Sequence, residues 1–441
     1  MSRLRFLLVL LLLGVAAPTG AEKFLVRVLP GDLLPVLERQ ELTLEEEVPD
    51  PDGELYLVSG EDSLSLALIA DDPSVLAVEV VEELVVPEID LEEVEASSDP
   101  LLDALRDTSQ VDFYGVDVWT GYVEQAAVDV VSAEEARDEA TGKDMVIAVI
   151  DTGVDPEHPI LAPSLLAGYD FTRDQPGTAS EWPDLDPEVA AELRQSVAWI
   201  LDDAQVAVLD QSVAWILDQS VAWILDGERL PSAFGHGTMV AGIVHLIAPK
   251  AKIMPLKAFT ADGTAETADI VRAIYHAVEH GADVINMSFS LGTFSAEILR
   301  AVNYAARQGV VSVASVGNNG TETLVYPAAL GLVIGVGSTT HDDQRSDFSN
   351  YGEDLVTLAA PGEAIVTTFP GGGSYAAGWG TSYSTPMVAG AVALWLDSME
   401  MEEVAPEELP SAVMERLRHC EELAGLGLGY GRLNAAAELD D

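Results

Sequence analysis

The stretch Gly380–Pro386, GTSYSTP, is the part of the sequence around which the rest of the chain is organised. Its glycine allows a tight turn, and the apolar run 387–396 behind it predicts a helix that begins near Ser382. A serine at a helix N-terminus combines a hydroxyl that can attack a carbonyl carbon with backbone N–H groups that can hold an oxyanion. Taken alone, the pattern is also typical of an ordinary N-cap serine, so its meaning depends on the other motifs.

Two further motifs supply the partners that a reactive serine needs. Asp151 ends the apolar run 145–150 in the sequence Asp-Thr-Gly, and His236 stands between glycines where a helical pattern begins. Acyl transfer by serine requires a base that takes the hydroxyl proton and an acid that orients the base. An aspartic protease is the alternative for Asp-Thr-Gly, but it needs a second carboxylate motif, and the sequence contains no other Asp-Thr-Gly or Asp-Ser-Gly.

Apolar runs alternate with helical patterns over the larger part of the chain. Such runs predict strands buried on both faces, and the alternation predicts an α/β fold, a parallel sheet with helices on both faces. Functional residues of these sheets gather at the carboxyl ends of strands, where Asp151 and Asn318 fall. The expected strands are 145–150, 252–256, 283–287, 310–316 and 332–336, and the expected helices are 237–247, 267–280 and 295–308.

The composition narrows the classes of function. The chain of 441 residues carries 75 acidic against 21 basic residues, a formal net charge of -54. Such a charge repels phosphate, which excludes nucleic acid as a natural partner. With 48% apolar residues, the length suffices for one large domain and one small one.

The first 21 residues have the pattern of a secretory signal peptide. Arg3 and Arg5 give the positive start, the apolar stretch 6–17 is short for a membrane span, and small residues follow at 19–21. We therefore expect a secreted protein with no membrane span in its mature chain; an uncleaved anchor is the alternative. Cys420 is the only cysteine of the sequence, which excludes an internal disulfide.

Residues 22–88 predict a small separate domain. Its strands and helices are expected in the order βαββαβ, which is typical of a ferredoxin-like α+β fold. The acidic stretch 89–110 has the composition of a linker, and the large domain then occupies 111–441. In the small domain, the expected strands are 23–29, 42–48, 54–59 and 76–86, and the expected helices are 32–38 and 61–70.

An eight-residue repeat lies inside the large domain at 195–226. The sequence QSVAWILD begins at Gln195, Gln211 and Gln219, and a diverged copy fills 203–210. An even period keeps the same side chains on one face of a strand, whereas eight residues overshoot two helical turns. Asp186-Pro187 upstream is a good helix start and favours a helix. The segment is compatible with a lid, an interaction arm, or a duplicated insertion in a tolerant loop.

Four motifs resemble those of the subtilisin-like serine proteases, the subtilase family, and the resemblance covers roughly residues 115–437. The order Asp, His, Ser is the one found in subtilisin. The resemblance implies that Ser382 is the nucleophile, His236 the general base and then acid, and Asp151 its orienting partner. It also implies an oxyanion hole made by the Asn318 amide and the Ser382 N–H. The motifs are VIAVIDTGVD at 146–155, GHGTMVAG at 235–242, Gly317-Asn318, and GTS with TPMVAG at 380–390.

The resemblance further implies two segments that line the pocket for a substrate side chain. One contains Ser288, Phe289 and Ser290, and the other runs from Ala314 to Gly317. The first segment would also pair antiparallel with an extended substrate through main-chain hydrogen bonds.

The sequence departs from the family pattern near these motifs. Residues 383–385 are larger than those usual after the nucleophile, and Ser290 stands where glycine is usual. Met239 and Met387 stand where histidine is frequent. The spacing from Asp151 to His236 is 85 residues (236 − 151), longer than is usual, and the repeat lies inside that excess. None of these departures removes a catalytic atom.

Residues 23–88 resemble the inhibitory propeptide of the family, most clearly in DDPSVLAVE at 71–79. This resemblance implies a domain that covers the active site until the chain cuts itself, and the alternative is a permanent binding domain. No cofactor is expected for the chemistry, whereas calcium with a structural role is compatible with the resemblance. The expected partners are protein or peptide substrates and the chain's own propeptide.

Two other classes of function are alternatives to an enzyme. A catalytically silent scaffold would lack a member of the triad, and none is missing. A surface assembly protein would use the tryptophan-bearing repeat 195–226. The sequence therefore predicts a secreted serine endopeptidase that is made as a self-processed zymogen.

Overall fold

The structure is a computed structural model, and it divides the chain into two compact units, 1–82 and 83–441. The boundary lies six residues before the expected one at 88. The expected signal peptide 1–21 lies wholly outside the described residues, and so does most of the expected linker 89–110 and of the repeat 195–226. The described ranges are 22–51, 53–60, 66–85, 107–177, 179–196, 207–208, 214–216, 230–398, 405–417, 423 and 425–436.

The first unit has its strands and helices in the order βαββαβ. The strands form one antiparallel sheet with the order β2-β3-β1-β4. Alternate residues of β1, Phe24, Val26 and Val28, are buried with Val36 and Ile69 of the two helices. The period of two in β1 therefore places its apolar face against α1 and α2. The elements are β1 (Glu22–Val28), α1 (Leu33–Gln40), β2 (Thr43–Val48), β3 (Leu55–Gly60), α2 (Leu66–Ala70) and β4 (Val75–Val80).

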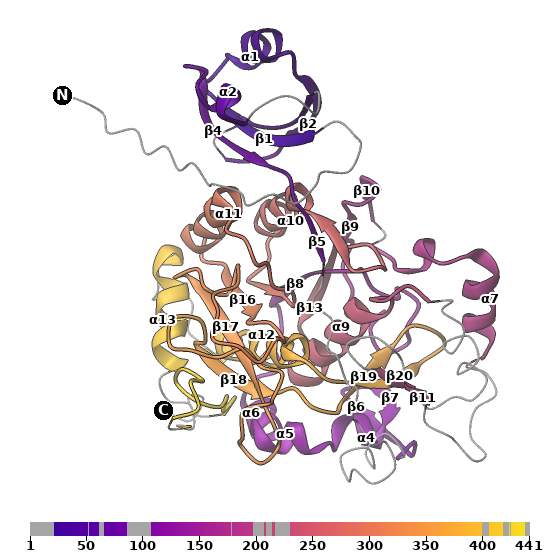
Figure 1. The fold of residues 1–441 in the computed structure, drawn as a ribbon. Coiled ribbons are helices and arrows are strands. Elements are labelled where there is room, and N and C mark those ends of the chain that lie inside the picture. The colour runs from indigo at the N-terminus through magenta and orange to yellow at the C-terminus, as the bar shows by residue number, and fades with distance from the viewer. Residues whose placement is uncertain are drawn as a thin grey trace. The chain divides into compact units, whose positions relative to one another are not determined.

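The second unit is built on an eight-stranded sheet (Figure 1). Its order is β10-β9-β13-β8-β15-β16-β17-β18, and all neighbouring pairs are parallel except β10 with β9. The expected parallel α/β sheet is thus confirmed, with one antiparallel edge. The strands are β8 (Val146–Asp151), β9 (Tyr169–Asp170), β10 (Gln175–Pro176), β13 (Lys252–Lys257), β15 (Val284–Met287), β16 (Val311–Ser315), β17 (Val333–Thr339) and β18 (Leu358–Pro361).

The order of strands reverses around β8. The chain runs from β8 to β13 on one side and then crosses back to β15 on the other. Ligand sites of open α/β sheets lie at such a reversal, beyond the carboxyl ends of the strands. Asp151 is the last residue of β8, and Ser288 directly follows β15, so both occupy this edge.

Two pairs of long helices cover the sheet. Helix α9 packs against α12, and α10 packs against α11; each of the four also contacts strands of the sheet. Because β16 and β17 are buried along their whole length, the sheet is covered on both faces. These helices are α9 (His236–Ile247), α10 (Thr267–Glu279), α11 (Ala296–Arg307) and α12 (Thr381–Ser398).

Short elements complete the second unit. A hairpin of β6 and β7 precedes three short helices, and β5 pairs antiparallel with β14. The expected strand 76–86 is therefore two strands, β4 and β5, and the expected linker 89–110 reaches the first residue of β6. The elements are β5 (Glu83–Val85), β6 (Gln110–Phe113), β7 (Val116–Trp119), α4 (Thr120–Val123), α5 (Ala126–Val130), α6 (Ala133–Glu139), β14 (Thr264–Glu266), η5 (Pro406–Glu408) and α13 (Leu409–Arg416).

The described part of the repeat contains strands as well as a helix end. Helix α7 (Pro187–Ser196) starts where Asp186-Pro187 predicts it, after the short helix η2 (Trp182–Asp184). The expectation of a helix is wrong for β11 (Ala207–Val208) and β12 (Ala214–Ile216). The reason is an available edge: β12 pairs with β20 (Ser374–Gly378), whose other neighbour is β19 (Ile365–Phe369).

Candidate active site

Asp151 and His236 form a buried, hydrogen-bonded pair. Nδ1 of His236 lies 2.8 Å from Oδ1 of Asp151, and the N–H of Thr152 donates to the same oxygen at 2.7 Å. Burial opposes the charged imidazolium, but the charge and hydrogen bond of Asp151, with the charge of Glu181, outweigh it and raise the pKa of His236. Nε2 of His236 has no hydrogen-bond partner among the described residues, so it is available to take a proton.

Ser382 is the second residue of α12, as the sequence predicts, and it is 4% exposed. Its Oγ donates to the carbonyl oxygen of Ser288 at 3.1 Å, not to His236. Pro386 has no N–H, so the carbonyl of Ser382 lacks its helical donor; the Ser288 hydroxyl donates to that carbonyl at 2.9 Å instead. The ring centroids of His236 and Tyr383 lie 5.8 Å apart, which places the histidine beside the serine segment.

Asn318 lies beyond the end of β16 and is tied to the start of α12. Its Oδ1 accepts hydrogen bonds from the N–H and the hydroxyl of Thr381, both at 2.9 Å. The amide is thereby fixed, and its Nδ2 donor has no hydrogen-bond partner among the residues that the structure describes. A fixed, unused N–H beside the serine is what an oxyanion site requires. The turn itself is held by Asn350, whose Oδ1 accepts from the N–H groups of Asn319 and Thr321.

The expected pocket residues fall into two groups. Ser288 exchanges two hydrogen bonds with Ser382, and a Cβ added to Gly317 would lie 3.0 Å from Oγ of Ser290. Ser288 therefore lies at Ser382, and Ser290 and Gly317 lie against each other. Phe289 is 2% exposed and packs on Phe259, and Ala314 is fully buried in β16. Phe289 and Ala314 thus belong to the core that supports the site.

Sequence motifs did not reveal two buried charged residues next to the pair. Glu181 is fully buried and accepts hydrogen bonds from the hydroxyls of Thr152 and Thr238, at 2.6 and 2.7 Å. Lys257 is also fully buried and donates to the carbonyl of Thr152 at 2.6 Å and to Asp184 at 2.7 Å. Neither Glu181 nor Lys257 stands in a recognisable sequence motif. The only signal in the sequence was the pair of threonines after Asp151 and His236, Thr152 and Thr238, whose hydroxyls both donate to Glu181.

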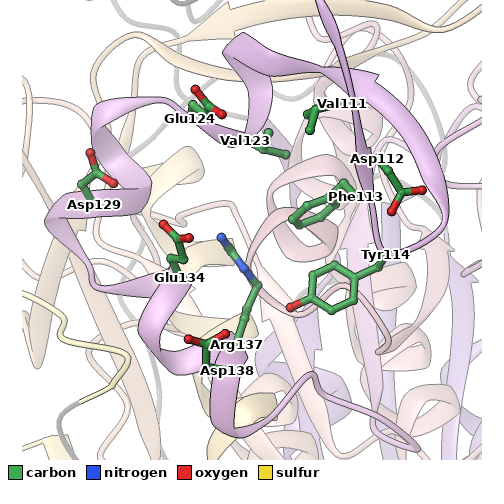
Figure 2. Close-up of a pocket in the computed structure, with 10 residues that line it drawn as sticks. All are labelled: Val111, Asp112, Phe113, Tyr114, Val123, Glu124, Asp129, Glu134, Arg137 and Asp138. Carbon is green, nitrogen blue, oxygen red and sulfur yellow. The ribbon is translucent and has the colours of Figure 1, made fainter.

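A hollow of about 520 Å³ lies between the β6–β7 hairpin and helices α4 to α6 (Figure 2). Arg137 stands among five carboxylates in its wall, and no residue of the Asp151–His236–Ser382 set lines it. The guanidinium donates to the carbonyl of Leu246 at 2.9 Å and lies 5.4 Å from the centre of the Phe113 ring. Arg137 therefore holds the C-terminal end of α9. The five carboxylates are Asp112, Glu124, Asp129, Glu134 and Asp138.

Within the described residues, no group of three or more His, Cys, Asp or Glu side chains could hold a metal ion. The same part of the chain has no helix with the length and apolar character needed to cross a bilayer.

The chain matches the model of the subtilase family of peptidases over residues 142–428, more than half of its length. It is 30% identical to an intracellular serine protease of Paenibacillus polymyxa over 333 residues, which cover 71% of this chain and 86% of that protein. It is 31% identical to thermitase of Thermoactinomyces vulgaris over 274 residues, 60% of this chain and 79% of thermitase.

A solved structure with the same fold is that of fervidolysin from Fervidobacterium pennivorans, described as a keratinolytic enzyme related to subtilisin. Its TM-score is 0.67 at 21% sequence identity, with 96% of this chain and 61% of that chain covered. The family match, the relatives and the shared fold agree with the motifs. The chain belongs to the subtilase family and is a serine-type endopeptidase.

Proposed function

We propose that Asp151, His236 and Ser382 are the catalytic triad of a secreted endopeptidase that is made as a self-processed zymogen. The observation that carries the triad is the 2.8 Å pair of Asp151 with Nδ1 of His236, which leaves Nε2 without a partner among the described residues. A histidine whose one nitrogen is fixed by a carboxylate and whose other is open is arranged as a general base.

The acylation step uses the residues as follows. The Ser382 hydroxyl turns from the Ser288 carbonyl, gives its proton to Nε2 of His236, and its oxygen bonds to the substrate carbonyl carbon. The carbonyl oxygen becomes an oxyanion held by Nδ2 of Asn318 and the N–H of Ser382. Asp151 stabilises the imidazolium, which then protonates the leaving amine as the peptide C–N bond breaks.

Deacylation repeats these steps with water. Water gives a proton to His236, its oxygen attacks the acyl carbon, and the bond to Ser382 Oγ breaks as the proton returns to that oxygen. The products are a carboxylic acid and the free enzyme. For the substrate side chain, we assign the small residues Ser288, Ser290 and Gly317 to the pocket, supported by Phe289 and Ala314 from within the core.

Two observations support a zymogen. The βαββαβ unit with strand order β2-β3-β1-β4 fits a ferredoxin-like propeptide. The residues directly after it, Glu83–Val85, lie on the second unit as a strand added to the edge of β14. An edge that accepts one extended segment by main-chain hydrogen bonds is suited to accept a substrate in the same way. Secretion rests on the signal-peptide pattern of residues 1–21.

A serine-directed fluorophosphonate tests the triad. We expect it to label Ser382 in the full chain, and we expect labelling to be lost in Ser382→Ala and strongly reduced in His236→Ala. Ser398 on the same helix provides the matched control, because its hydroxyl donates to the carbonyl of Trp395 near the helix end, and Ser398→Ala should label normally. An adduct on any residue other than Ser382, located by peptide mass analysis, would contradict the proposal.

A further inference from the structure

Glu181 lies where the two motifs that carry Asp151 and His236 meet. Its neighbour Ser180 is bridged to Val154, so the segment runs along the residues that follow β8. The N–H of Val154 donates to the carbonyl of Ala179 at 2.8 Å, which fixes the register of the two segments. Backbone pairing therefore delivers the Glu181 side chain to this position.

The Glu181 carboxylate joins the two motifs directly. Oε1 accepts from the hydroxyl of Thr152, the residue after Asp151, at 2.6 Å, and from the N–H of Gly237, the residue after His236, at 3.2 Å. Oε2 accepts from the hydroxyl of Thr238 at 2.7 Å. One carboxylate thus accepts two hydrogen bonds from the first turn of α9 and one from the residue that directly follows β8. The N-terminus of a helix is a favourable place for such a negative charge.

The backbone segments around this contact are packed too closely to admit even a Cβ atom at two glycines. A Cβ added to Gly237 would lie 2.0 Å from the carbonyl oxygen of Gly153, and one added to Gly153 would lie 2.7 Å from the carbonyl oxygen of Ala179. Three backbone segments therefore touch, and Glu181 is fully buried between them. A shift of one segment must move the others.

The charges around Glu181 come from every neighbouring element. Asp151 ends β8, Lys257 ends β13, and His236 begins α9. Burial raises the pKa of Glu181 to about 7, and the charge of Asp151 adds to this, while the two threonine hydrogen bonds and Lys257 act in the opposite direction. Tyr383 of α12 faces His236; burial and the charge of Asp151 raise its pKa, so it stays neutral.

We propose that Glu181 is a positioning residue of the reaction: it locks Asp151 and His236 in register and stabilises the imidazolium by its charge. The proposal rests on the triad proposed above. It adds a second carboxyl to the chemistry, beside that of Asp151. The Glu181 carboxyl acts through Thr152, Gly237 and Thr238 and does not touch the substrate. The charge of Glu181 is one of the causes that raise the pKa of His236, and the pKa of Glu181 is itself about 7, so the two titrations are coupled and the acidic limb of activity belongs to the pair.

The test compares Glu181→Gln with Glu297→Gln, which alters another buried carboxyl, paired with Arg300 on α11. The readouts are kcat, KM and the pH profile of kcat/KM on a peptide anilide, with thermal unfolding measured in parallel. Glu181→Gln should lower kcat roughly 10- to 100-fold with little change in KM, because misplacement of catalytic groups costs rate. Its acidic limb should move down by roughly 0.5–1 pH unit, less than a directly contacting charge produces.

A second pair of variants, both at Thr238, tests the proposal independently if Glu181→Gln does not fold. Thr238→Val removes one hydroxyl from the carboxylate, whereas Thr238→Ser keeps it. We expect the valine variant to lose kcat and shift the acidic limb downward, and the serine variant to retain both. If Glu181→Gln and Thr238→Val leave the acidic limb in place and lower kcat no more than Glu297→Gln, the proposal is overturned. Fluorophosphonate labelling of Ser382 in the unmodified chain separates this failure from failure of the triad itself.

Discussion

Thr381 and Ser288 show how single side chains fix the surroundings of Ser382, the proposed nucleophile. Thr381 precedes Ser382 and donates both its N–H and its hydroxyl to Oδ1 of Asn318, which fixes the amide group through its oxygen. Ser288 satisfies the carbonyl of Ser382 that Pro386 leaves without a donor. Both contacts fix backbone and donor geometry before a substrate binds, and this preorganisation is what electrostatic stabilisation of an oxyanion depends on.

Replacement of Asn318 by alanine should lower kcat while KM changes little. The reason is that its amide donor interacts with the oxyanion of the transition state more strongly than with the bound substrate. The expected loss is roughly 10²- to 10³-fold, a figure that comes from subtilisin itself. Steady-state kinetics on a peptide anilide measure it, with Asn303→Ala on α11 as the control. A loss below about threefold would reduce Asn318 to a turn residue.

The difference between Ser382 and Glu181 marks what sequence can reveal of a site. Asp151, His236, Asn318 and Ser382 stand in motifs whose glycines and apolar runs fix the local backbone, so the sequence singles them out as candidates. The structure places Asp151 against His236, and Asn318 against the residue before Ser382. Glu181 lies beside Asp151 and His236 because its neighbour Ser180 forms a β-bridge with Val154, 26 residues earlier in the chain (180 − 154). No local sequence pattern predicts that bridge. The resting hydrogen bond of Ser382 to Ser288 is likewise a product of tertiary packing.

Helix α9 begins at His236, the proposed general base, and is anchored at its other end. His236 is its first residue, and the Arg137 guanidinium holds the carbonyl of Leu246 near its last turn, where a positive charge is favourable. His245 lies between them with Nδ1 3.3 Å from the Tyr122 hydroxyl, which itself donates to the carbonyl of Gly242 at 2.6 Å. All twelve residues of the helix are buried, so its position depends on these polar contacts being satisfied.

Acidification should weaken the fold through His245. Burial, followed by the charges of His158 and Arg137, lowers the pKa of His245 to about 4, whereas an unfolded histidine titrates near 6.5. Between pH 6.5 and pH 4 the histidine is protonated in the unfolded chain but not in the folded one. The contribution of neutral His245 to the free energy of unfolding is therefore fully present above pH 6.5 and is lost as the pH falls towards 4. The loss should be roughly 2 kcal/mol between pH 7.5 and pH 5. Denaturant unfolding of His245→Asn should show a smaller loss; equal losses in both proteins would contradict this.

Excision of residues 195–226 should leave a folded, active enzyme. The segment fills a connection, and a change of loop length alters closure entropy by only about 0.6 kcal/mol per doubling. Its β12 is an addition to β20, which keeps β19 as its other neighbour. Thermal unfolding should shift by less than about 4 °C. The contrast is Leu193→Ala, which truncates a core side chain of α7 at a cost of roughly 2–5 kcal/mol. A shortened protein that cannot fold or be labelled would place the repeat in the core.

At the scale of the whole molecule, the central strands of the main sheet and the helices that cover it were predictable, whereas the peripheral strands of the large unit were not. The five expected strands and three expected helices of the large unit match β8, β13, β15, β16, β17, α9, α10 and α11 within a few residues. These elements could be predicted because a continuous or periodic run of apolar residues indicates a buried strand or helix. The expected strand 76–86 is split into β4 and β5, and the sequence does not show this because valines continue across the break. The boundary at residue 82 is set by tertiary contacts, which no local sequence pattern records.

Ser382→Ala should stop maturation as well as catalysis. The chain order is a signal-peptide pattern, the βαββαβ unit, the strand β5 on the edge of β14, and then the catalytic unit. If the first unit is a propeptide, the segment after β5 is the first substrate, and its attachment to the enzyme gives the scissile bond a high effective concentration. Without the Ser382 hydroxyl no acyl intermediate forms, so only slow attack by water remains.

The position of the cut follows from what the catalytic unit cannot lose. Phe113 and Val118 of the β6–β7 hairpin belong to the core, and the N–H of Trp119 donates to the Tyr375 hydroxyl at 3.1 Å. Cleavage inside the hairpin would remove these contacts, so the new N-terminus should fall within 86–106. Expression in a protease-deficient host, with mass and N-terminal sequencing, should show the alanine variant starting near Glu22 and the unmodified chain starting in that window. Trimming of the alanine variant at the same bond and rate would assign maturation to another protease, and trimming of neither protein would make residues 22–82 a permanent domain.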